Sequence, residues 1–298
     1  FLMVLSKSEA KRLIREFKPD LILGTGGFAC WPVIAMGPRM GIPTCVHESN
    51  AGFGKAIAKE LRRVDRIFVN FPDTARRHGL ENDPRVMRVG NPHMPGFAVA
   101  DRQESRRALG IADDECFILA FGGSRGAPVL NDGVLDLAVR LAQSSPKTLL
   151  LHGTGKDDFA RMTQLYREKG LDKCPRVTVT EYIYDMPLRM AAADVVISRA
   201  GAMTISELAL LGKAAVLIPS PNVADNHQFK NAQSLAEAGA ALCVTEKELP
   251  DGGLIRAVER LQADAVLRTS VGRAVYAGFA CPDANEIMYQ EMLKLCRQ

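Results

Sequence analysis

Two glycine-rich segments each follow a short apolar run in this sequence. Residues 122–127 read GGSRGA and open a helical pattern, and residues 24–27 read GTGG. Glycines let the backbone approach a ligand closely, and the start of a helix offers free N–H groups and a positive dipole end to a phosphate. A tight turn without a ligand explains either segment as well, because a lone glycine-rich loop is a weak signal. The signal of residues 24–27 is the weaker one, since the start of the helix after it is uncertain.

Residues 200–207, with the sequence AGAMTISE, follow another apolar run. Thr204 and Glu207 have the spacing of a capping box, which would make Glu207 only a helix cap. The functional interpretation is that Thr204 and nearby N–H groups bind phosphate while the Glu207 carboxylate accepts hydrogen bonds from sugar hydroxyls. Both interpretations are open at this point.

Polar side chains also crowd a helix start in residues 219–232, after a further apolar run. A plain helix cap needs fewer such groups, so this pattern favours recognition of a polyhydroxyl ligand. The side chains concerned are Asp225, Asn226, His227, Gln228 and Asn231.

The tetrad His47-Glu48-Ser49-Asn50 is a candidate for acid–base chemistry. A histidine beside a glutamate could act as a base with its orienting partner, whereas the alternative is an ordinary polar turn with a half-buried histidine. There is no Asp-x-Asp motif, no zinc-ligand spacing and no G-x-S-x-G motif. The sequence therefore predicts neither a metal site nor a cofactor nor a serine hydrolase.

Short apolar runs alternate with amphipathic segments along the whole chain, which predicts parallel sheets covered by helices. We expect strands near residues 21–23, 44–47, 66–69, 86–89, 116–121, 148–151, 177–179, 195–198, 215–218 and 241–244. We expect helices at residues 6–17, 54–64 and 104–109, among others. The fold class is α/β, with two doubly wound parallel-sheet domains facing a cleft and ligands at the carboxyl ends of the strands.

The expected domains are residues 1–96 and 97–298, joined by a linker at residues 91–101, with the last helix able to pack back on the first domain. The net charge of +4 is too small to indicate nucleic acid, and seven cysteines without C-x-x-C spacing fit a reducing compartment. The longest uncharged run, residues 21–38, is interrupted by glycine and proline. Any membrane contact is therefore expected to be peripheral.

The glycine-rich and polar segments described above, in their order along the chain, resemble those of the MurG-type N-acetylglucosaminyltransferases, which belong to the GT-B class. Further matching stretches are residues 89–92, 152–156 and 182–186. The resemblance implies metal-independent, inverting transfer of N-acetylglucosamine from UDP-N-acetylglucosamine. The implied acceptor is the C4 hydroxyl of undecaprenyl-linked N-acetylmuramyl-pentapeptide, in peptidoglycan synthesis at the cytoplasmic face of the bacterial membrane. It implies no cofactor and no nucleic acid.

The resemblance also assigns roles to single residues. Glu207 would hold the ribose hydroxyls, Gln228 the sugar, and Ile183 the uracil through its backbone. Asn50 would reach the donor from the first domain, and His47 or Glu48 is the candidate base. Diphosphate contacts would come from Gly123, Ser124 and Gly126 and from the segment Ala202, Met203, Thr204, Ile205 and Ser206.

Two departures from the family pattern shape the expectations. His93 and Met94 stand where the family often has an arginine, and the family's early G-G-T-G-G-H loop is not found. We therefore expect the first domain to lack roughly two βα units, to have fewer strands than the second, and to expose apolar side chains near residues 21–23 or Val46. The alternatives are another GT-B lipid glycosyltransferase, such as a diacylglycerol glycosyltransferase, or a UDP-sugar-binding remnant without catalysis.

A peripheral membrane surface is expected on the first domain, because the implied acceptor is a lipid. An apolar patch and a basic cluster, partly on one helix face, could form it, although a solvated charged face explains the cluster as well. The apolar candidates are Phe1, Leu2, Val4 and Leu5, and the basic ones are Lys55, Lys59, Arg62, Arg63 and Arg66.

Overall fold

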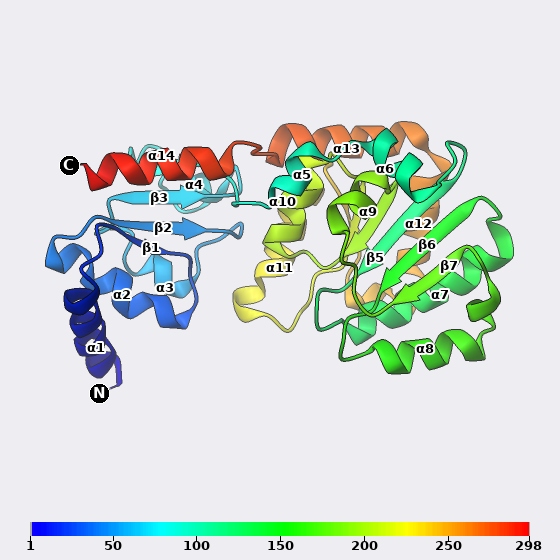
Figure 1. Cartoon of the computed structure of the whole chain (residues 1–298), viewed down its shortest axis with the longest axis horizontal. Coiled ribbons are helices and arrows are strands. Elements are labelled where there is room, and N and C mark those ends of the chain that lie inside the picture. Colours follow the sequence, from blue (N-terminus) through cyan, green and yellow to red (C-terminus); the bar gives the residue numbers. More distant parts are fainter. Residues whose placement is uncertain (1, 298) are drawn as a thin grey trace. The chain divides into compact units, whose positions relative to one another are not determined.

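The computed structural model describes the backbone of residues 2–297 and the side chains of residues 6–297. The chain forms two compact units (Figure 1): unit 1 comprises Phe1–His93 and Cys281–Gln298, and unit 2 comprises Met94–Ala280. The chain therefore leaves unit 1, builds the whole of unit 2, and returns to unit 1 with its last helix.

Unit 1 contains a parallel sheet with the order β1-β2-β3-β4, which is four-stranded over the part of the chain that the structure describes. Its helices include one that comes from the far end of the sequence. The strands are β1 (Ile22–Gly24), β2 (Thr44–Glu48), β3 (Arg66–Val69) and β4 (Val86–Arg88), and the α-helices are α1 (Leu2–Phe17), α2 (Trp31–Met36), α3 (Lys55–Ala58), α4 (Thr74–Arg77) and α14 (Ala284–Cys296).

Successive side chains of a strand point to opposite faces of a sheet, and both faces of this sheet are covered. Cys45 and Phe68 lie in one apolar cluster with Met288 and Leu295 of α14. The neighbouring residue Val46 lies in another cluster, with residues of α1, α2 and α3. The last helix is thus part of the core of unit 1 (Figure 1).

Unit 2 contains a larger parallel sheet, with the order β10-β9-β8-β5-β6-β7. The chain starts in the middle at β5, runs outward through β6 and β7, and then returns to the other side of β5 with β8. In such a sheet, ligands bind at the carboxyl ends of the strands where the order reverses, here between β5 and β8. The strands are β5 (Cys116–Phe121), β6 (Thr148–Gly153), β7 (Val177–Thr180), β8 (Val195–Ser198), β9 (Ala215–Leu217) and β10 (Leu242–Cys243).

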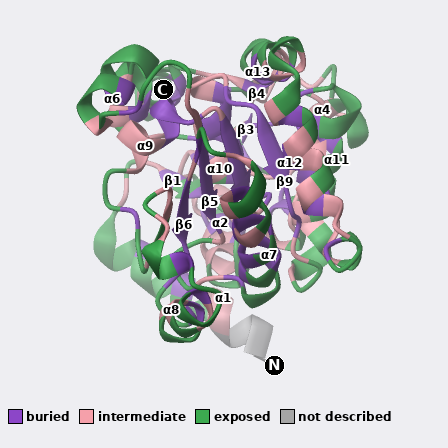
Figure 2. Cartoon of the chain, turned by 90° about the vertical axis from the view of Figure 1, so that its right-hand side faces the viewer, coloured by how far each residue is buried: buried purple, intermediate pink, exposed green. Residues whose placement is uncertain are grey.

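Helices on both faces bury this sheet, as Figure 2 shows by the buried strands and the exposed outer faces of the helices. Side chains of α7, α8 and α12 pack on Ile118 and Ile197 in the main core. Asp101 caps α6 by accepting a hydrogen bond from the Glu104 backbone, as expected for an aspartate at a helix start. The helices are α5 (Pro95–Val99), α6 (Arg102–Leu109), α7 (Pro128–Ser144), α8 (Phe159–Glu168), α9 (Met186–Ala192), α10 (Ala202–Leu210), α11 (His227–Glu237), α12 (Gly253–Ala263) and α13 (Ala265–Phe279).

The expected fold class is confirmed, with two parallel-sheet α/β units, and several local expectations are corrected. The helix expected at residues 54–64 is wrong beyond α3, which ends at Ala58, so the basic residues after it do not share a helix face. The expected linker contains a helix, α5. Unit 1 has four described strands against six in unit 2. Val46 is fully buried, whereas Leu23 on the edge strand is 37% exposed.

Among the described residues, no helix has the length and apolar content needed to cross a bilayer.

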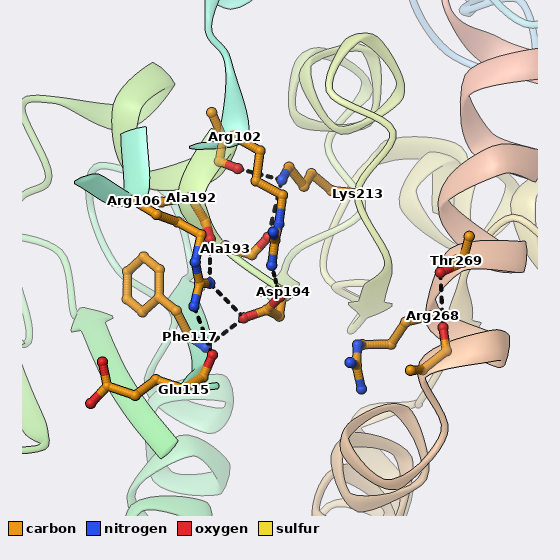
Figure 3. Close-up of polar contacts among 12 residues, drawn as sticks. Arg102, Arg106, Glu115, Phe117, Ala192, Ala193, Asp194, Lys213, Arg268 and Thr269 are labelled. Atoms are coloured by element: carbon orange, nitrogen blue, oxygen red, sulfur yellow. Dashed lines mark hydrogen bonds and ion pairs between the residues drawn. The ribbon is translucent and has the colours of Figure 1, made fainter. Parts of the chain in front are cut away.

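A buried arginine fixes the amino edge of the unit 2 sheet. Arg106 of α6 is 1% exposed. Its guanidinium donates to Asp194 Oδ2 at 2.9 Å and to the Glu115 carbonyl at 2.8 Å, and Asp194 Oδ2 also accepts from the Phe117 backbone N–H at 2.8 Å (Figure 3). Burial opposes ionisation of Asp194, yet this N–H and the nearby arginines hold the pKa of its carboxyl below the ordinary value. The network ties α6 to the starts of β5 and β8.

We expect Arg106→Met to destabilise unit 2 by about 3 kcal/mol, because the change leaves buried oxygen acceptors without their cation. Hydrogen exchange of the β5 and β8 amides should accelerate accordingly. Arg107→Met is the matched control, since Arg107 is exposed on the same helix. Equal protection in the two variants would contradict the structural role of Arg106.

Candidate functional site

A pocket of about 210 Å³ lies within unit 2 at the carboxyl ends of its strands. Segments at the ends of β5, β6 and β7 and the helix α10 after β8 contribute to it, so it lies at the position where the strand order reverses. Its lining residues are Met94, Phe97, Phe121, Gly123, Ser124, Gly153, Gly155, Glu181, Tyr182, Ile183, Met186 and Glu207.

Two glycine loops pack backbone against backbone at one side of this pocket. Gly126 has φ +92° and Gly155 has φ +80°, both in the region that favours glycine. A Cβ on Gly126 would lie 2.3 Å from the Thr154 carbonyl oxygen, and one on Gly155 would lie 2.1 Å from the Gly126 nitrogen. The Lys156 N–H also donates to the Ser124 carbonyl at 3.1 Å. The loop containing Gly123, Ser124 and Gly126 is therefore held by the loop after β6.

A buried polar network lies beneath these loops. Asn131 Nδ2 donates to the Thr154 carbonyl at 2.9 Å and to Asp158 Oδ2 at 2.7 Å. The side-chain oxygen Oδ1 of Asn131 lies 3.1 Å from His152 Nε2, and the Tyr166 hydroxyl lies 2.8 Å from Nδ1. These partners assign the proton to Nε2, and burial lowers the pKa of His152 to about 3. The neutral imidazole is a structural link between β6, α7 and α8.

The loop after β7 offers free backbone groups to the pocket. Ile183 is 6% exposed, and its side chain occupies the space where a Cβ on Gly153 would lie 2.8 Å away. Within the described chain, no hydrogen bond involves the backbone N–H or carbonyl of Ile183. Tyr182 beside it is 48% exposed and stacks edge-on against Tyr184. An adenine-like or pyrimidine edge could pair with the backbone while an aromatic ring covers it.

Helix α10 follows β8 and therefore begins at the same edge of the sheet. Its N-cap is Gly201, and no side chain caps the helix. Of the two interpretations left open for Thr204 and Glu207, the capping box is therefore wrong, because α10 begins earlier than that spacing assumes. Met203 is 44% exposed, whereas Ile205 and Ser206 are buried, and the Ser206 hydroxyl donates to the Ala202 carbonyl at 3.1 Å. From this segment, the side chains of Ile205 and Ser206 face the core, so only their backbone could serve a ligand.

Glu207 lines the pocket, and no hydrogen bond or ion pair of its carboxylate is found among the described residues. Burial alone raises the pKa of this carboxyl to about 7. A carboxylate that is largely buried without a donor is unfavourable for the fold. This feature is typical of a group whose partner is a ligand.

The start of α11 lies after β9. Gln228 Oε1 accepts a hydrogen bond from the Ser220 N–H at 2.9 Å, which leaves its amide N–H₂ for another acceptor. Asn231 is fully buried and donates to the Ala200 carbonyl at 3.1 Å, so it connects α11 to the loop before α10. Asp225 and Asn226 have positive φ values of 53° and 51°. Such strained turns cluster at functional sites.

The tetrad after β2 in unit 1 forms a compact turn. His47 is 3% exposed, and its Nε2–H donates to the Gly90 carbonyl at 2.8 Å; burial lowers its pKa. Glu48 is 4% exposed and accepts hydrogen bonds from the backbone N–H groups of Asn50, at 2.9 Å, and Gly54, at 2.8 Å. Asn50 also donates through Nδ2 to Glu48. These contacts favour a structural role for both His47 and Glu48 over that of a base.

His93, where the resemblance led us to expect an arginine, contacts the returning C-terminal segment. Its N–H donates to Asn285 Oδ1 at 2.9 Å, Asn285 Nδ2 donates to the His93 carbonyl at 3.0 Å, and His93 Nε2 lies 3.0 Å from the Pro282 carbonyl. Met94 begins unit 2 and lines its pocket. His93 thus has a packing role within unit 1.

Sequence reasoning did not identify the network of Asn131, His152 and Tyr166. Its only sequence signal is an isolated polar residue in each of several apolar segments, which does not say which segments meet. Gly126 and Gly155 lie in segments that the sequence analysis identified, residues 122–127 and 152–156, but the contact between the two glycines was not predicted.

The family comparisons agree with this geometry. The model of the glycosyltransferase family 28 C-terminal domain matches residues 117–274, and that of the family 28 N-terminal domain matches residues 2–69. The solved MurG of Acinetobacter baumannii superposes with a TM-score of 0.76 at 26% identity, covering 98% of this chain and 78% of that one. A UDP-GlcNAc 2-epimerase of Neisseria meningitidis, with a TM-score of 0.67 and 15% identity, shows the shared fold alone.

Curated relatives indicate the type of transferase within this family. A protein of Bacillus thuringiensis strain Al Hakam is 36% identical over 97% of this chain and 78% of its own length. A protein of Leuconostoc citreum is 36% identical over 96% of this chain and 76% of its own length. Both are named UDP-N-acetylglucosamine–N-acetylmuramyl-(pentapeptide) pyrophosphoryl-undecaprenol N-acetylglucosamine transferase. The chain therefore belongs to glycosyltransferase family 28, and within it to the MurG-type UDP-N-acetylglucosamine-dependent transferases.

Proposed function

We infer that this chain transfers N-acetylglucosamine from UDP-N-acetylglucosamine to undecaprenyl-linked N-acetylmuramyl-pentapeptide in peptidoglycan synthesis. The relatives named above carry this activity in their names. The observation that carries the proposal is the unpartnered Glu207 carboxylate in a pocket beside the glycine loops. That arrangement fits a ribose next to a diphosphate.

The pocket supports one orientation of the donor. Uracil pairs with the free backbone groups of Ile183 and lies against Tyr182, and the ribose hydroxyls donate to Glu207. The diphosphate lies against Gly123, Ser124 and Gly126. It also lies against the first turn of α10, which contains the exposed Met203 and the partly exposed Thr204. Gln228 takes the sugar. Asn50, which the resemblance also assigns to the donor, belongs to unit 1, and its contact with the donor stays a prediction.

We propose inverting displacement for the reaction. The acceptor C4 oxygen forms a bond to the anomeric carbon while the bond from that carbon to the UDP oxygen breaks, and the hydroxyl proton passes to a base. Backbone N–H groups of the glycine loop and of the first turn of α10 stabilise the negative charge that develops on the diphosphate, without a metal ion. The contacts of His47 and Glu48 leave the base unassigned.

Turnover is measured with radiolabelled UDP-N-acetylglucosamine and a soluble analogue of the lipid acceptor. Labelled disaccharide product supports the proposal, and donor binding without any product would instead support the binding-remnant alternative. A diacylglycerol acceptor in parallel distinguishes the other lipid glycosyltransferase.

Glu207→Gln should weaken UDP binding by about tenfold to a hundredfold, because a charge-assisted hydrogen bond is worth about 1.5–3 kcal/mol. The same change should raise the melting temperature above pH 7. A carboxyl with a folded pKa of about 7 retains its proton while the unfolded one loses it near pH 4, so folding becomes less favourable as pH rises between these values. Calorimetric titration with UDP and melting curves at pH 4 and 8 measure both effects.

Glu181→Gln is the control for this prediction, since Glu181 is an exposed carboxylate of the same pocket. Loss of its charge should leave UDP binding unchanged or slightly stronger. If the two variants bind UDP equally, Glu207 does not hold the ribose.

The disaccharide product should have the β configuration at the new linkage, and its rate of formation should persist in EDTA. Direct displacement inverts the α-linked donor, and helix N-termini replace a cation at the diphosphate. Proton NMR of the product and initial rates with and without chelator measure this. An α-linked product would exclude direct displacement.

We also propose that unit 1 binds the membrane surface that holds the lipid acceptor. An apolar cavity of about 520 Å³ in unit 1 is lined by Phe28, Trp31, Pro32 and the stems of Lys55 and Lys59. Phe28 is 92% exposed, and the ammonium groups of Lys7 and Lys59 lie 4.7 and 5.5 Å from the centre of the Trp31 ring. Apolar side chains ringed by lysines fit an anionic lipid surface.

Two other basic members of the expected membrane patch are paired with carboxylates. Arg63 pairs with Glu60 at 3.0 Å and Arg66 with Glu291 at 3.3 Å. Arg62 is exposed. The side chains of Phe1, Leu2, Val4 and Leu5 lie outside the described residues.

Combining Phe28→Ser with Lys59→Gln should lower partitioning to phosphatidylglycerol vesicles by about a hundredfold. The estimate adds one aromatic side chain at about 2 kcal/mol to one basic residue at about 1 kcal/mol. Vesicle flotation measures it, with Phe17→Ser as control because Phe17 is 82% exposed outside the cavity. Unchanged flotation of the double variant would place membrane binding elsewhere.

A further inference from the structure

A second polar pocket of unit 2 lies at the opposite edge of its sheet from the proposed donor site. Its volume is about 380 Å³. Asp194 and Lys213 lie just before β8 and β9, and so at the amino ends of these strands. Arg102 of α6 and the residues Arg268 and Thr269 of α13 complete it (Figure 3).

The pocket has more cationic hydrogen-bond donors than acceptors. Asp194 uses Oδ1 for Arg102 Nη2 at 2.6 Å, and its Oδ2 accepts from Arg106 and from the Phe117 backbone. Both carboxylate oxygens are therefore occupied. The Arg268 Nη1 donates to the carbonyls of Leu261 and Gln262, at 2.6 and 2.8 Å, and no acceptor among the described residues is found for its Nε and Nη2.

Lys213 adds a buried cation. The residue is 6% exposed, and its ammonium donates to two carbonyls at the end of α9, those of Ala191 and Ala193. An ammonium has three N–H groups, so one is left over. A role as a helix C-terminal cap explains the first two bonds, but it explains neither the third N–H nor the spare donors of Arg268 across the pocket.

The pocket is lined by more positively charged side chains than negatively charged ones. Arg102, Lys213 and Arg268 line it with a single carboxylate, Asp194, and Arg106 lies behind that carboxylate. Burial, followed by the nearby Arg102, lowers the pKa of Lys213 to about 8. Asp194 and Asp101 oppose this shift and Arg106 adds to it. A bound anion would compensate the unfavourable burial of this ammonium.

We propose that this pocket binds a small phosphate-bearing anion, independently of the nucleotide site. Phosphate oxygens can accept from spare N–H groups of the two arginines and the lysine that line the pocket, and a guanidinium can bind two oxygens at once. The ligand class is inorganic phosphate or a phosphate monoester, because cationic side chains of α6, α13 and the turn before β9 line one small pocket. The site adds a function to unit 2 that sugar transfer itself does not require.

Lys213→Met tests the site, since methionine keeps most of the side-chain volume without the charge. Binding of inorganic phosphate and of glycerol 3-phosphate is followed by calorimetry and by ³¹P NMR. We expect each ligand to bind wild type and to lose at least about tenfold in affinity in Lys213→Met and in Arg268→Gln. The tighter of the two ligands identifies whether the phosphate is free or esterified.

The melting temperature of Lys213→Met should fall, because the Ala191 and Ala193 carbonyls lose their donor, so phosphate binding is compared at a temperature at which both proteins are folded. UDP affinity should not change in either variant, and UDP should not displace the phosphate. Lys169→Met is the matched control, since Lys169 is an exposed lysine at the end of α8 that lines neither pocket. Unchanged phosphate binding by folded Lys213→Met, or full displacement of phosphate by UDP, would overturn the proposal.

Discussion

The proposed donor site depends on the approach of two backbones, at Gly126 and Gly155, that leaves no room for a side chain on either residue. This approach brings the loops after β5 and β6 together into one wall of the pocket. The contact is steric, so the loop positions are fixed before any ligand arrives. The fully bonded group of Asn131, His152, Asp158 and Tyr166 supports the wall from below. Sites supported in this way lose little conformational freedom on binding.

A buried arginine and a partly buried glutamate of unit 2 illustrate opposite relations between stability and function. Arg106 is surrounded by oxygen acceptors and an aspartate, and its contacts join α6 to the sheet. Glu207 has no described partner, and burial raises its pKa. The Arg106 contacts stabilise the folded state, whereas the unpaired Glu207 carboxylate destabilises it and is tolerated because the rest of the fold is stable enough. An unsatisfied carboxylate at the end of a parallel sheet is therefore a better indicator of a ligand than a well-paired one.

Much of the fold could be predicted from the pattern of apolar runs. The runs at residues 66–69, 116–121 and 195–198 coincide with β3, β5 and β8 because a strand buried on both faces must be apolar throughout. Helix ends were less predictable. Thr204 and Glu207 have capping-box spacing but lie inside α10, while Thr245 and Glu248 form a real capping box at the short 3₁₀ helix Glu246–Glu248. The spacing alone does not say where the helix begins.

The site was predictable in its segments but not in its packing. The loop of Ser124, the segment of Glu207 and the loop of Ile183 were identified, and the structure brings all three to one pocket. The tetrad of His47 and Glu48 was identified as well, but its side chains bond to backbone groups of their own unit. Which polar side chains face a ligand and which face the backbone depends on tertiary contacts that a single sequence does not contain.

The return of the last helix to unit 1 has a consequence for the order in which the protein is synthesised. Domains generally fold as units while the chain is being made, with the earlier part first. Residues 94–280 form unit 2 by themselves and can fold as soon as they have left the ribosome. The face of the first sheet that carries Cys45, Phe68 and Val89 remains uncovered until α14 is made. The N-terminal unit is therefore completed last, and a chain that stops after Ala280 would present this apolar face to chaperones and proteases.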